Sequence, residues 1–186
     1  MHSTQAQPDT PAFPFVVKAD EQPGEPFAAV DREQPDADAF RAYADGSALG
    51  NPGPGGWACL IQYKDGSRIV KAGGCAYTTN NRAELQGAIE ALMELPTTAL
   101  GELRLDSEYV VKAVTEWRRD WERRGFRTSS SKPVKNADLF RVLFALVDER
   151  PGVRLTWVRG HSGEPGNELV DSLARAEALK AKEGVQ

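Results

Sequence analysis

Four acidic residues are the strongest candidates for chemistry in this sequence: Asp45, Glu84, Asp106 and Asp171. Asp45 and Asp106 each end a short apolar run that predicts a strand, whereas Glu84 and Asp171 lie early in segments with helical periodicity. Any one of them alone would fit a turn residue or a helix cap equally well. The prediction of a site therefore depends on a fold that brings the four together.

Carboxylates gathered within a few ångströms repel one another, and some would hold a proton through a raised pKa unless the repulsion were compensated. A bound divalent cation compensates it. Because the oxygen ligands come without a His or Cys cluster, Mg²⁺ is favoured over zinc, with Mn²⁺ as an alternative. One or two such ions can hold the attacking water and the leaving oxygen of a phosphodiester. The residue types therefore predict metal-assisted phosphodiester hydrolysis.

The periodicity of the apolar residues predicts an α/β domain. Strands are expected at residues 40–45, 57–63, 68–77, 103–106 and 153–158. Helices are expected at residues 80–95, 137–149 and about 164–182, and in the stretch that contains Val110, Val114 and Trp117. Lys64–Ser67 has the composition of a hairpin turn, and Thr79 or Asn80 is expected to be a helix N-cap.

The order of these elements predicts a five-stranded mixed sheet flanked by helices, with three antiparallel strands followed by parallel ones. The helix at 80–95 permits a right-handed crossover that lays strand 103–106 parallel to strand 40–45. The carboxyl ends of these strands then lie side by side, at the switch point where open α/β sheets bind ligands. We expect Asp45 and Asp106 at these ends, with Glu84 above them on the crossover helix and Asp171 reaching the same place.

The first 38 residues differ in composition from the rest of the chain. Residues 1–40 contain eight acidic and two basic residues, a net charge of −6 within a total of −4, so the remainder carries +2. Residues 1–38 are predicted to form a disordered acidic arm, and residues 39–182 the catalytic domain. The apolar segment Phe13–Val17 leaves two alternatives open, an added edge strand or a docking peptide.

Two cysteines, Cys59 and Cys75, fit neither a metal cluster nor a dense disulfide framework, so both are expected to be reduced core thiols. The apolar run Ala12–Val17 is interrupted by Pro14 and is too short for the core of a signal sequence or for a membrane span. We expect a cytoplasmic protein that acts as a monomer without membrane association.

A basic segment covers residues 112–135, with eight basic residues against three acidic ones. It is interleaved with Trp117, Trp121 and Phe126, and such a mixture of cations and aromatic rings is typical of nucleic-acid-binding surfaces. A solvated charged face is the simpler alternative for the charges. A position in the core is an equal alternative for one of the tryptophans.

Several spaced motifs resemble those of the type 1 ribonuclease H family. The matching segments are Tyr43–Trp57, Thr78–Leu85, Leu105–Val110, Lys132–Asn136, Gly160–Gly163 and Asn167–Asp171. They occur in the family's order and span about residues 40–180. The resemblance implies a ribonuclease H fold and an endoribonuclease that cuts the RNA strand of RNA·DNA hybrids. Sequence preference should be weak, because contacts to 2′-hydroxyls select RNA.

The resemblance also implies roles for individual residues. It implies that Asp45, Glu84, Asp106 and Asp171 are the metal-binding catalytic acids. It implies that His161, in a glycine-rich loop, handles a proton or eases product release. Binding of the hybrid is implied for Asn51, Thr79, Asn80 and Asn81. Binding of the DNA strand is implied for a basic protrusion that contains Trp117, Arg118, Arg119, Trp121, Arg123 and Arg124.

Two positions depart from the commonest bacterial pattern, because Glu108 stands where Gln is frequent and Asp120 where Asn is frequent. Each adds negative charge near the expected phosphate path. Two other classes of function share some of these features. A non-catalytic hybrid-binding module would be expected to lack at least one of the four acids, and all are present. A DNA exonuclease or integrase-like enzyme would share the carboxylates, but the Asn51–Gly56 loop, the Thr78–Arg82 segment and the basic segment favour the hybrid nuclease.

Overall fold

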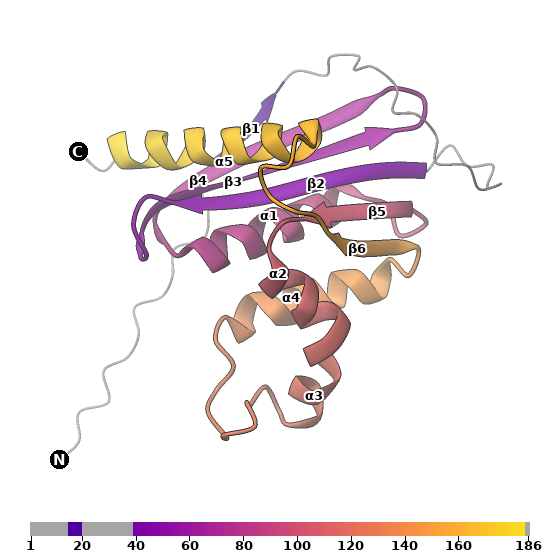
Figure 1. Ribbon diagram of the computed structural model, residues 1–186, viewed down its shortest axis with the longest axis vertical. Helices are drawn as coiled ribbons and strands as arrows, with labels where there is room; N and C mark the ends of the chain where they lie inside the picture. Colours follow the sequence, from indigo (N-terminus) through magenta and orange to yellow (C-terminus); the bar gives the residue numbers. More distant parts are fainter. Residues whose placement is uncertain (1–14, 20–38, 185–186) are drawn as a thin grey trace.

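The structure is a computed structural model that describes residues 15–19 and 39–184. Its centre is a six-stranded sheet in the order β1-β4-β3-β2-β5-β6 (Figure 1). The strands are β1 (Phe15–Ala19), β2 (Ala39–Ala48), β3 (Gly53–Tyr63), β4 (Arg68–Thr78), β5 (Leu100–Leu105) and β6 (Val153–Trp157). The helices are α1 (Asn80–Glu94), α2 (Glu108–Lys112), the π-helical turn η1 (Ala113–Trp117), α3 (Arg118–Arg123), α4 (Ala137–Glu149) and α5 (Pro165–Glu183).

The sheet has the predicted mixed character. β2, β3 and β4 pair antiparallel, whereas β5 is parallel to β2 and β6 is parallel to β5. The hairpin between β3 and β4 turns at Lys64–Ser67, where the Asp65 carboxylate accepts the backbone N–H of Ser67 at 2.8 Å. α1 then crosses to β5. From β2 onward the order of elements is the predicted one, which confirms the fold class.

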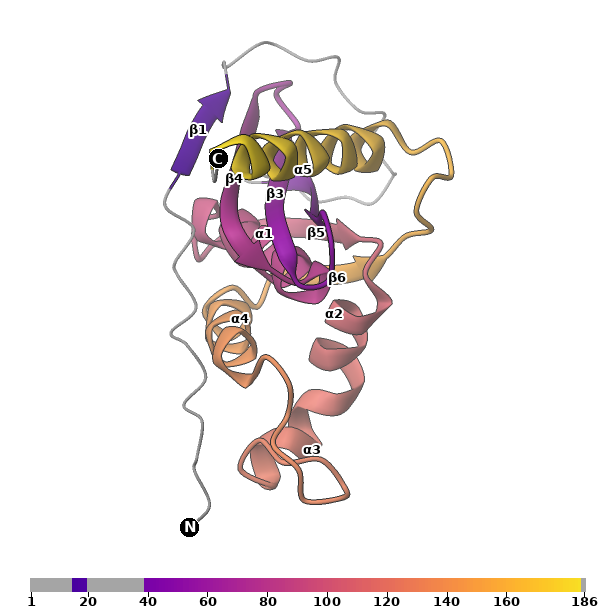
Figure 2. The same ribbon diagram turned by 90° about the vertical axis from the view of Figure 1, so that its left-hand side faces the viewer.

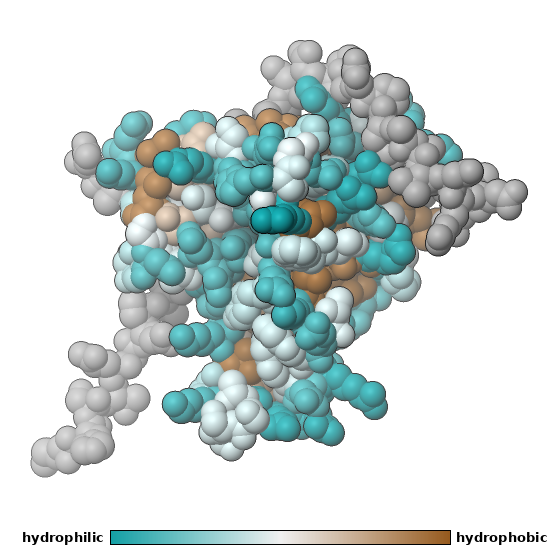
Figure 3. All heavy atoms as spheres, viewed as in Figure 1, coloured by the Kyte–Doolittle hydropathy of each residue, from teal (hydrophilic) through white to brown (hydrophobic). Residues whose placement is uncertain are grey.

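Helices cover both faces of the sheet. Figure 2 shows α5 on one face, and α1, α2 and α4 on the other. The larger hydrophobic core includes the fully buried Trp57 and Phe140. A smaller core between α5 and the sheet contains Leu60 and Val170. α2, η1, α3 and the loop that follows extend away from the sheet as a protrusion, whose surface carries mainly hydrophilic and neutral residues in Figure 3.

β1 pairs antiparallel with β4, from Phe15 opposite Gly74 to Ala19 opposite Val70. Residues 15–19 of the predicted disordered arm thus form a strand, which agrees with the added edge strand left open as an alternative for Phe13–Val17, and the five predicted strands gain a sixth. The physical reason is that β4 would otherwise be an edge strand with unpaired N–H and C=O groups, which a short extended segment can satisfy. The rest of the predicted arm, residues 1–14 and 20–38, lies outside the described residues.

Three further features bear on the predictions. β2 continues three residues beyond Asp45 and β3 begins at Gly53, so the Gly/Pro-rich connection is shorter than predicted. Pairing between strands overrides the loop preference of glycine here, with an irregularity of register between Gly53 and Gly55. Cys59 and Cys75 are free and buried, as predicted. No helix in the described part of the chain has the length and apolar character needed to cross a membrane.

Candidate active site

Asp45 and Asp106 lie side by side just beyond the last paired residues of the parallel strands β2 and β5. Ala44 of β2 pairs with Leu105 of β5, so the next residue in each strand direction is one of the two acids. Asp45 is buried, with 8% of its surface exposed. The backbone at Asp106 is held by Trp157, whose indole Nε1 donates to the Asp106 carbonyl oxygen at 3.0 Å. The fold thus brings these two candidate residues together.

α1 carries Glu84 to the same place, because this helix packs directly against β2. A Cβ at Gly46 would lie 2.0 Å from the carbonyl carbon of Ala83, so the close approach of the two backbones requires glycine. The Glu84 carboxylate accepts a hydrogen bond from the hydroxyl of Ser107. This bond links the crossover helix to the end of β5.

α5 brings Asp171 to the site from the other face of the sheet. Asn167, one turn earlier on α5, is buried and donates from Nδ2 to Oδ2 of Asp106 at 3.2 Å. Gly166 packs on the ring of Tyr43, where an added Cβ would lie 2.3 Å from a ring carbon. These contacts seat the first turns of α5 over β2 and β5, and so place the fourth acid near the other three.

Burial and mutual repulsion perturb the carboxyl groups. The pKa of Asp45 is raised to about 8, chiefly by burial and next by the negative charge of Asp106, with smaller contributions from Asp171 and Glu84. Burial likewise raises the pKa of Glu84. The site therefore concentrates negative charge in a poorly solvated place, and a cation would relieve this repulsion.

The donor set fits a hard divalent cation, because carboxylate oxygens are the ligands that Mg²⁺ and Mn²⁺ prefer. Three of the carboxylates face local donors instead, namely the Gly46 N–H, the Ser107 hydroxyl and the Asn167 amide. Within residues 15–19 and 39–184, no three His, Cys, Asp or Glu side chains form a group set to hold a metal ion.

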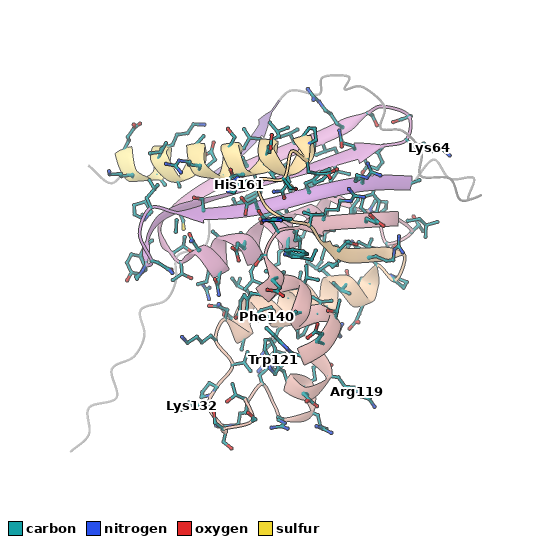
Figure 4. The ribbon with its side chains drawn as sticks, in the orientation of Figure 1. Lys64, Arg119, Trp121, Lys132, Phe140 and His161 are labelled. Atoms are coloured by element: carbon teal, nitrogen blue, oxygen red, sulfur yellow. The ribbon has the colours of Figure 1, made fainter. Side chains whose placement is uncertain are left out.

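His161 lies in the loop of residues 158–164 between β6 and α5, called the His161 loop below, and Figure 4 shows it near the start of α5. Its side chain is 81% exposed, and Nδ1 lies 3.8 Å from Oδ2 of Asp171. The backbone is left-handed at His161, with a φ of 51°, and at Gly163, with a φ of 83°. The loop thus presents the imidazole to solvent beside the acidic residues.

The four polar residues predicted to bind the hybrid lie on two adjacent connections: Asn51 between β2 and β3, and Thr79, Asn80 and Asn81 at the start of α1. Thr79 is the N-cap, and its hydroxyl accepts a backbone N–H of the first turn. The Asn80 side chain accepts the N–H of Ala48 at 2.7 Å, and the Asn51 side chain accepts the N–H of Asn80 at 3.4 Å. These bonds tie the two connections together, and all three asparagines remain exposed.

Trp117 and Trp121 pack into an aromatic cluster within the protrusion. Their ring centroids are 5.5 Å apart, and Trp121 meets Phe140 of α4 edge-on at 5.1 Å. Figure 4 shows Trp121 and Phe140 directed toward one another. Both tryptophans are partly buried against the larger core. The sequence left open that one of the two tryptophans lies in the core. Both are partly buried there, and the exposed part of each ring stays a candidate for stacking on the substrate.

The four arginines predicted to bind the DNA strand differ in their surroundings. Arg118 donates to both oxygens of Asp148 and to Glu122, and its guanidinium lies 4.8 Å from the centroid of Phe144. Arg118 therefore packs α3 against α4 in this structure. Arg119, Arg123 and Arg124 are exposed, and Figure 4 shows Arg119 directed outward from the protrusion.

The two acidic departures from the bacterial pattern are paired within their own helical segments. Glu108 lies 2.6 Å from Lys112, and Asp120 lies 2.6 Å from Arg123. These ion pairs offset the added negative charge, although exposed pairs of this kind are weak.

Three residues that contact the candidate site were not singled out from the sequence: Ser107, Trp157 and Asn167. Asn167 precedes Asp171 by four residues, and Ser107 follows Asp106 directly. Helical spacing could therefore have suggested Asn167, because residues four apart share a helix face. No sequence pattern indicates that the Trp157 indole reaches the Asp106 carbonyl.

The sequence is similar to those of known proteins. The RNase H family model matches residues 37–179. The Ribonuclease H of Methylorubrum extorquens (strain PA1) is 56% identical over 143 residues, which cover 75% of this chain and 61% of that protein. The Ribonuclease H of Marinobacter nauticus is 51% identical over 132 residues, which cover 71% of this chain and 88% of that protein.

The fold is also similar to those of solved RNase H structures. LC9-RNase H1, a type 1 RNase H with the type 2 active-site motif, matches with a TM-score of 0.68 at 31% identity, over 80% of this chain and 76% of that one. LC11-RNase H1, solved in complex with an RNA/DNA hybrid, matches with a TM-score of 0.58 at 25% identity, over 76% of this chain and 98% of that one.

Fold and site together define a nuclease of the hydrolase class. The chain belongs to the ribonuclease H family, as its motifs predicted. Dependence on divalent metal is general in this family. The chain spans 61% of the length of the M. extorquens relative and 88% of that of the M. nauticus relative.

Proposed function

We propose that this protein is an endoribonuclease that hydrolyses the RNA strand of RNA·DNA hybrids with weak sequence preference. The observation that carries the proposal is the position of Asp45 and Asp106 side by side where the pairing of β2 with β5 ends, with Glu84 and Asp171 close enough to raise the pKa of Asp45. Membership of the ribonuclease H family supports it, as does the likeness to LC11-RNase H1, which was solved with an RNA/DNA hybrid.

The four carboxylates would hold one or two Mg²⁺ ions, with Mn²⁺ as an alternative. When bound, such ions activate a water and stabilise the charge that develops on the leaving oxygen of the phosphodiester. Ser107 and Asn167 orient Glu84 and Asp106 through their hydrogen bonds. His161, exposed beside Asp171, would transfer a proton or ease the departure of product, because imidazole exchanges protons near neutral pH.

Selectivity for RNA cannot come from the carboxylates, which would hydrolyse any phosphodiester placed on them. We assign it to contacts with 2′-hydroxyls in the wide minor groove of the hybrid, made by Asn51, Thr79, Asn80 and Asn81. The protrusion would hold the DNA strand, with Trp117 and Trp121 available for stacking and the exposed arginines for phosphate contacts. We further propose that the protein acts as a cytoplasmic monomer without membrane association.

Incubation with end-labelled RNA·DNA, RNA·RNA and DNA·DNA duplexes of one sequence, with and without Mg²⁺, tests this function. We expect cleavage of the RNA strand of the hybrid alone, at several internal positions, and none in EDTA. An Asp106→Asn sample prepared identically controls for contaminating nucleases. Comparable cleavage of DNA·DNA would instead favour a DNA nuclease, and hybrid binding without cleavage would favour the non-catalytic module.

A further inference from the structure

Glu164 stands where the His161 loop meets α5, as the N-cap residue of that helix. Its Oε1 accepts a hydrogen bond from the hydroxyl of Tyr43 at 2.5 Å and another from Nη1 of Arg104 at 3.1 Å. Tyr43 lies on β2, two residues before Asp45, and Arg104 lies on β5, two residues before Asp106. One carboxylate oxygen thus ties the loop to both strands that lead to the acids.

These contacts are partly protected from solvent. Tyr43 is 2% exposed, and the side chains of Arg104 and Glu164 are 20% and 29% exposed. Arg104 is itself held in place, because its Nε donates to Glu102 at 3.2 Å. Charge-assisted hydrogen bonds shielded in this way are stronger than surface ion pairs. The group formed by Tyr43, Glu164 and Arg104, here called the Glu164 clamp, is therefore a firm attachment.

The opposite end of the His161 loop is attached to β5, the strand that carries Arg104. Val158 donates its N–H to the Leu105 carbonyl at 2.9 Å. Within the loop, the Ser162 hydroxyl donates to the Arg159 carbonyl at 2.6 Å. Between the two attachments the loop passes so close to Asp106 that a Cβ at Gly160 would lie 2.9 Å from its Oδ2. The attachments therefore set where the imidazole of His161 stands relative to the carboxylates.

We propose that the Glu164 clamp positions the His161 loop over the carboxylates, which makes Glu164 a positioning residue for hybrid cleavage. This inference rests on the proposed function, since it takes His161 as part of the catalytic machinery. A positioning role for Glu164 differs from a merely structural role in one measurable respect. A structural ion pair would change the melting temperature on removal, but not the turnover of the folded enzyme.

Steady-state cleavage of the hybrid in Mg²⁺ separates the two roles. Glu164→Ala removes both hydrogen bonds, and we expect kcat to fall roughly 10-fold with KM unchanged, a part of the roughly 10²-fold that a general acid or base contributes. Glu164→Gln keeps an oxygen acceptor for Tyr43 and Arg104 and should recover most of the loss. Glu149→Ala is the matched control, because it breaks the 3.0 Å ion pair with Arg150, which contacts neither the clamp nor Glu102. Arg150 keeps its hydrogen bonds to the Leu95 and Leu146 carbonyls, so this variant should leave kcat unchanged.

Non-additivity tests whether Glu164 acts through His161. In a His161→Ala background, Glu164→Ala should cause little further loss, because the loop then has no imidazole to position. An equal loss in both backgrounds would overturn the proposal. If Glu164→Ala does not fold, Tyr43→Phe removes one bond while it keeps the ring under Gly166, and it should give a smaller loss with the same pattern.

A measurement without catalysis separates failure of the clamp from failure of the proposed function. Backbone ¹⁵N order parameters of residues 160–163 in the enzyme alone should fall in Glu164→Ala and stay as in the wild type in Glu164→Gln and Glu149→Ala. Unchanged order parameters would refute the clamp whatever the substrate is. If His161→Ala itself leaves turnover unchanged, the proposed role of the histidine fails, and the order parameters still decide whether the clamp holds the loop.

Discussion

Gly160 lies against the carboxylate of Asp106, so closely that a Cβ on Gly160 would be 2.9 Å from Oδ2. The neighbour that must give way is a side-chain oxygen and not backbone, so Gly160→Ala should fold and melt near the wild-type temperature. The added methyl group would displace the carboxylate of Asp106. We expect turnover on the hybrid to fall roughly 10- to 100-fold, since small misplacements of catalytic groups are costly. Wild-type kcat in this variant would show that the position of Asp106 is not critical.

Asp45 gives the protein a stability that depends on pH in the absence of metal. The pKa of Asp45 is about 8 in the folded chain against an ordinary 3.8, so between these values the folded state holds a proton that the unfolded state has released. The free energy of unfolding therefore decreases as the pH rises through this range. Asp45→Asn cannot ionise, and in EDTA at pH 8 it should melt at a higher temperature than the wild type.

Melting temperatures of the same two proteins at lower pH and in Mg²⁺ serve as controls. The advantage of Asp45→Asn should shrink as the pH falls and vanish below the ordinary pKa of 3.8, where the carboxyl is protonated in both folded and unfolded chains. It should also shrink in Mg²⁺, because an ion that binds the folded wild type stabilises it by mass action. A variant that melts at or below the wild-type temperature at pH 8 in EDTA would contradict the burial and repulsion assigned to Asp45.

The arginines of the protrusion should separate into two groups. Arg118 pairs with Asp148 and lies over Phe144, so Arg118→Ala should lower the melting temperature. Arg119 and Arg124 are exposed, so the double alanine variant should melt normally but bind the hybrid more weakly. The slope of log affinity against log salt should flatten by roughly 0.7 to 0.9 for each arginine that binds a phosphate in the wild type. An unchanged slope would show that these two side chains do not bind phosphate.

β1 lies at the edge of the sheet away from the site, separated from β2 by β4 and β3. Deletion of residues 1–37 should therefore leave cleavage of the hybrid unchanged. It should lower the melting temperature slightly, because the deletion removes the backbone pairing of β1 with β4. Deletion of residues 1–14, which keeps β1, is the control for the melting temperature. A loss of turnover in the longer deletion alone would mean that β1 supports the site.

The positions of Asp45 and Asp106 could be predicted because they depend on general rules. A right-handed crossover places two parallel strands side by side, and each acid directly follows the last paired residue of its strand. The pairing of Arg118 with Asp148 could not be predicted, since it depends on how α3 packs on α4. The bond between Tyr43 and Glu164 joins residues 121 positions apart, and no local pattern indicates it. The sequence left an added edge strand as one alternative for Phe13–Val17 but could not select it, because the edge that β1 covers exists only after β4 has joined the sheet.

Single-turnover cleavage by Asp106→Asn, with binding measured on the same hybrid in Mg²⁺, tests the central claim most directly. The amide keeps the shape of the side chain and can still contact Asn167, but it removes an anionic metal ligand. We expect the dissociation constant to stay within a few-fold of the wild-type value, and the cleavage rate at saturating enzyme to fall by roughly 10³-fold or more. A cleavage rate near that of the wild type would contradict the assignment of the carboxylates as the catalytic centre.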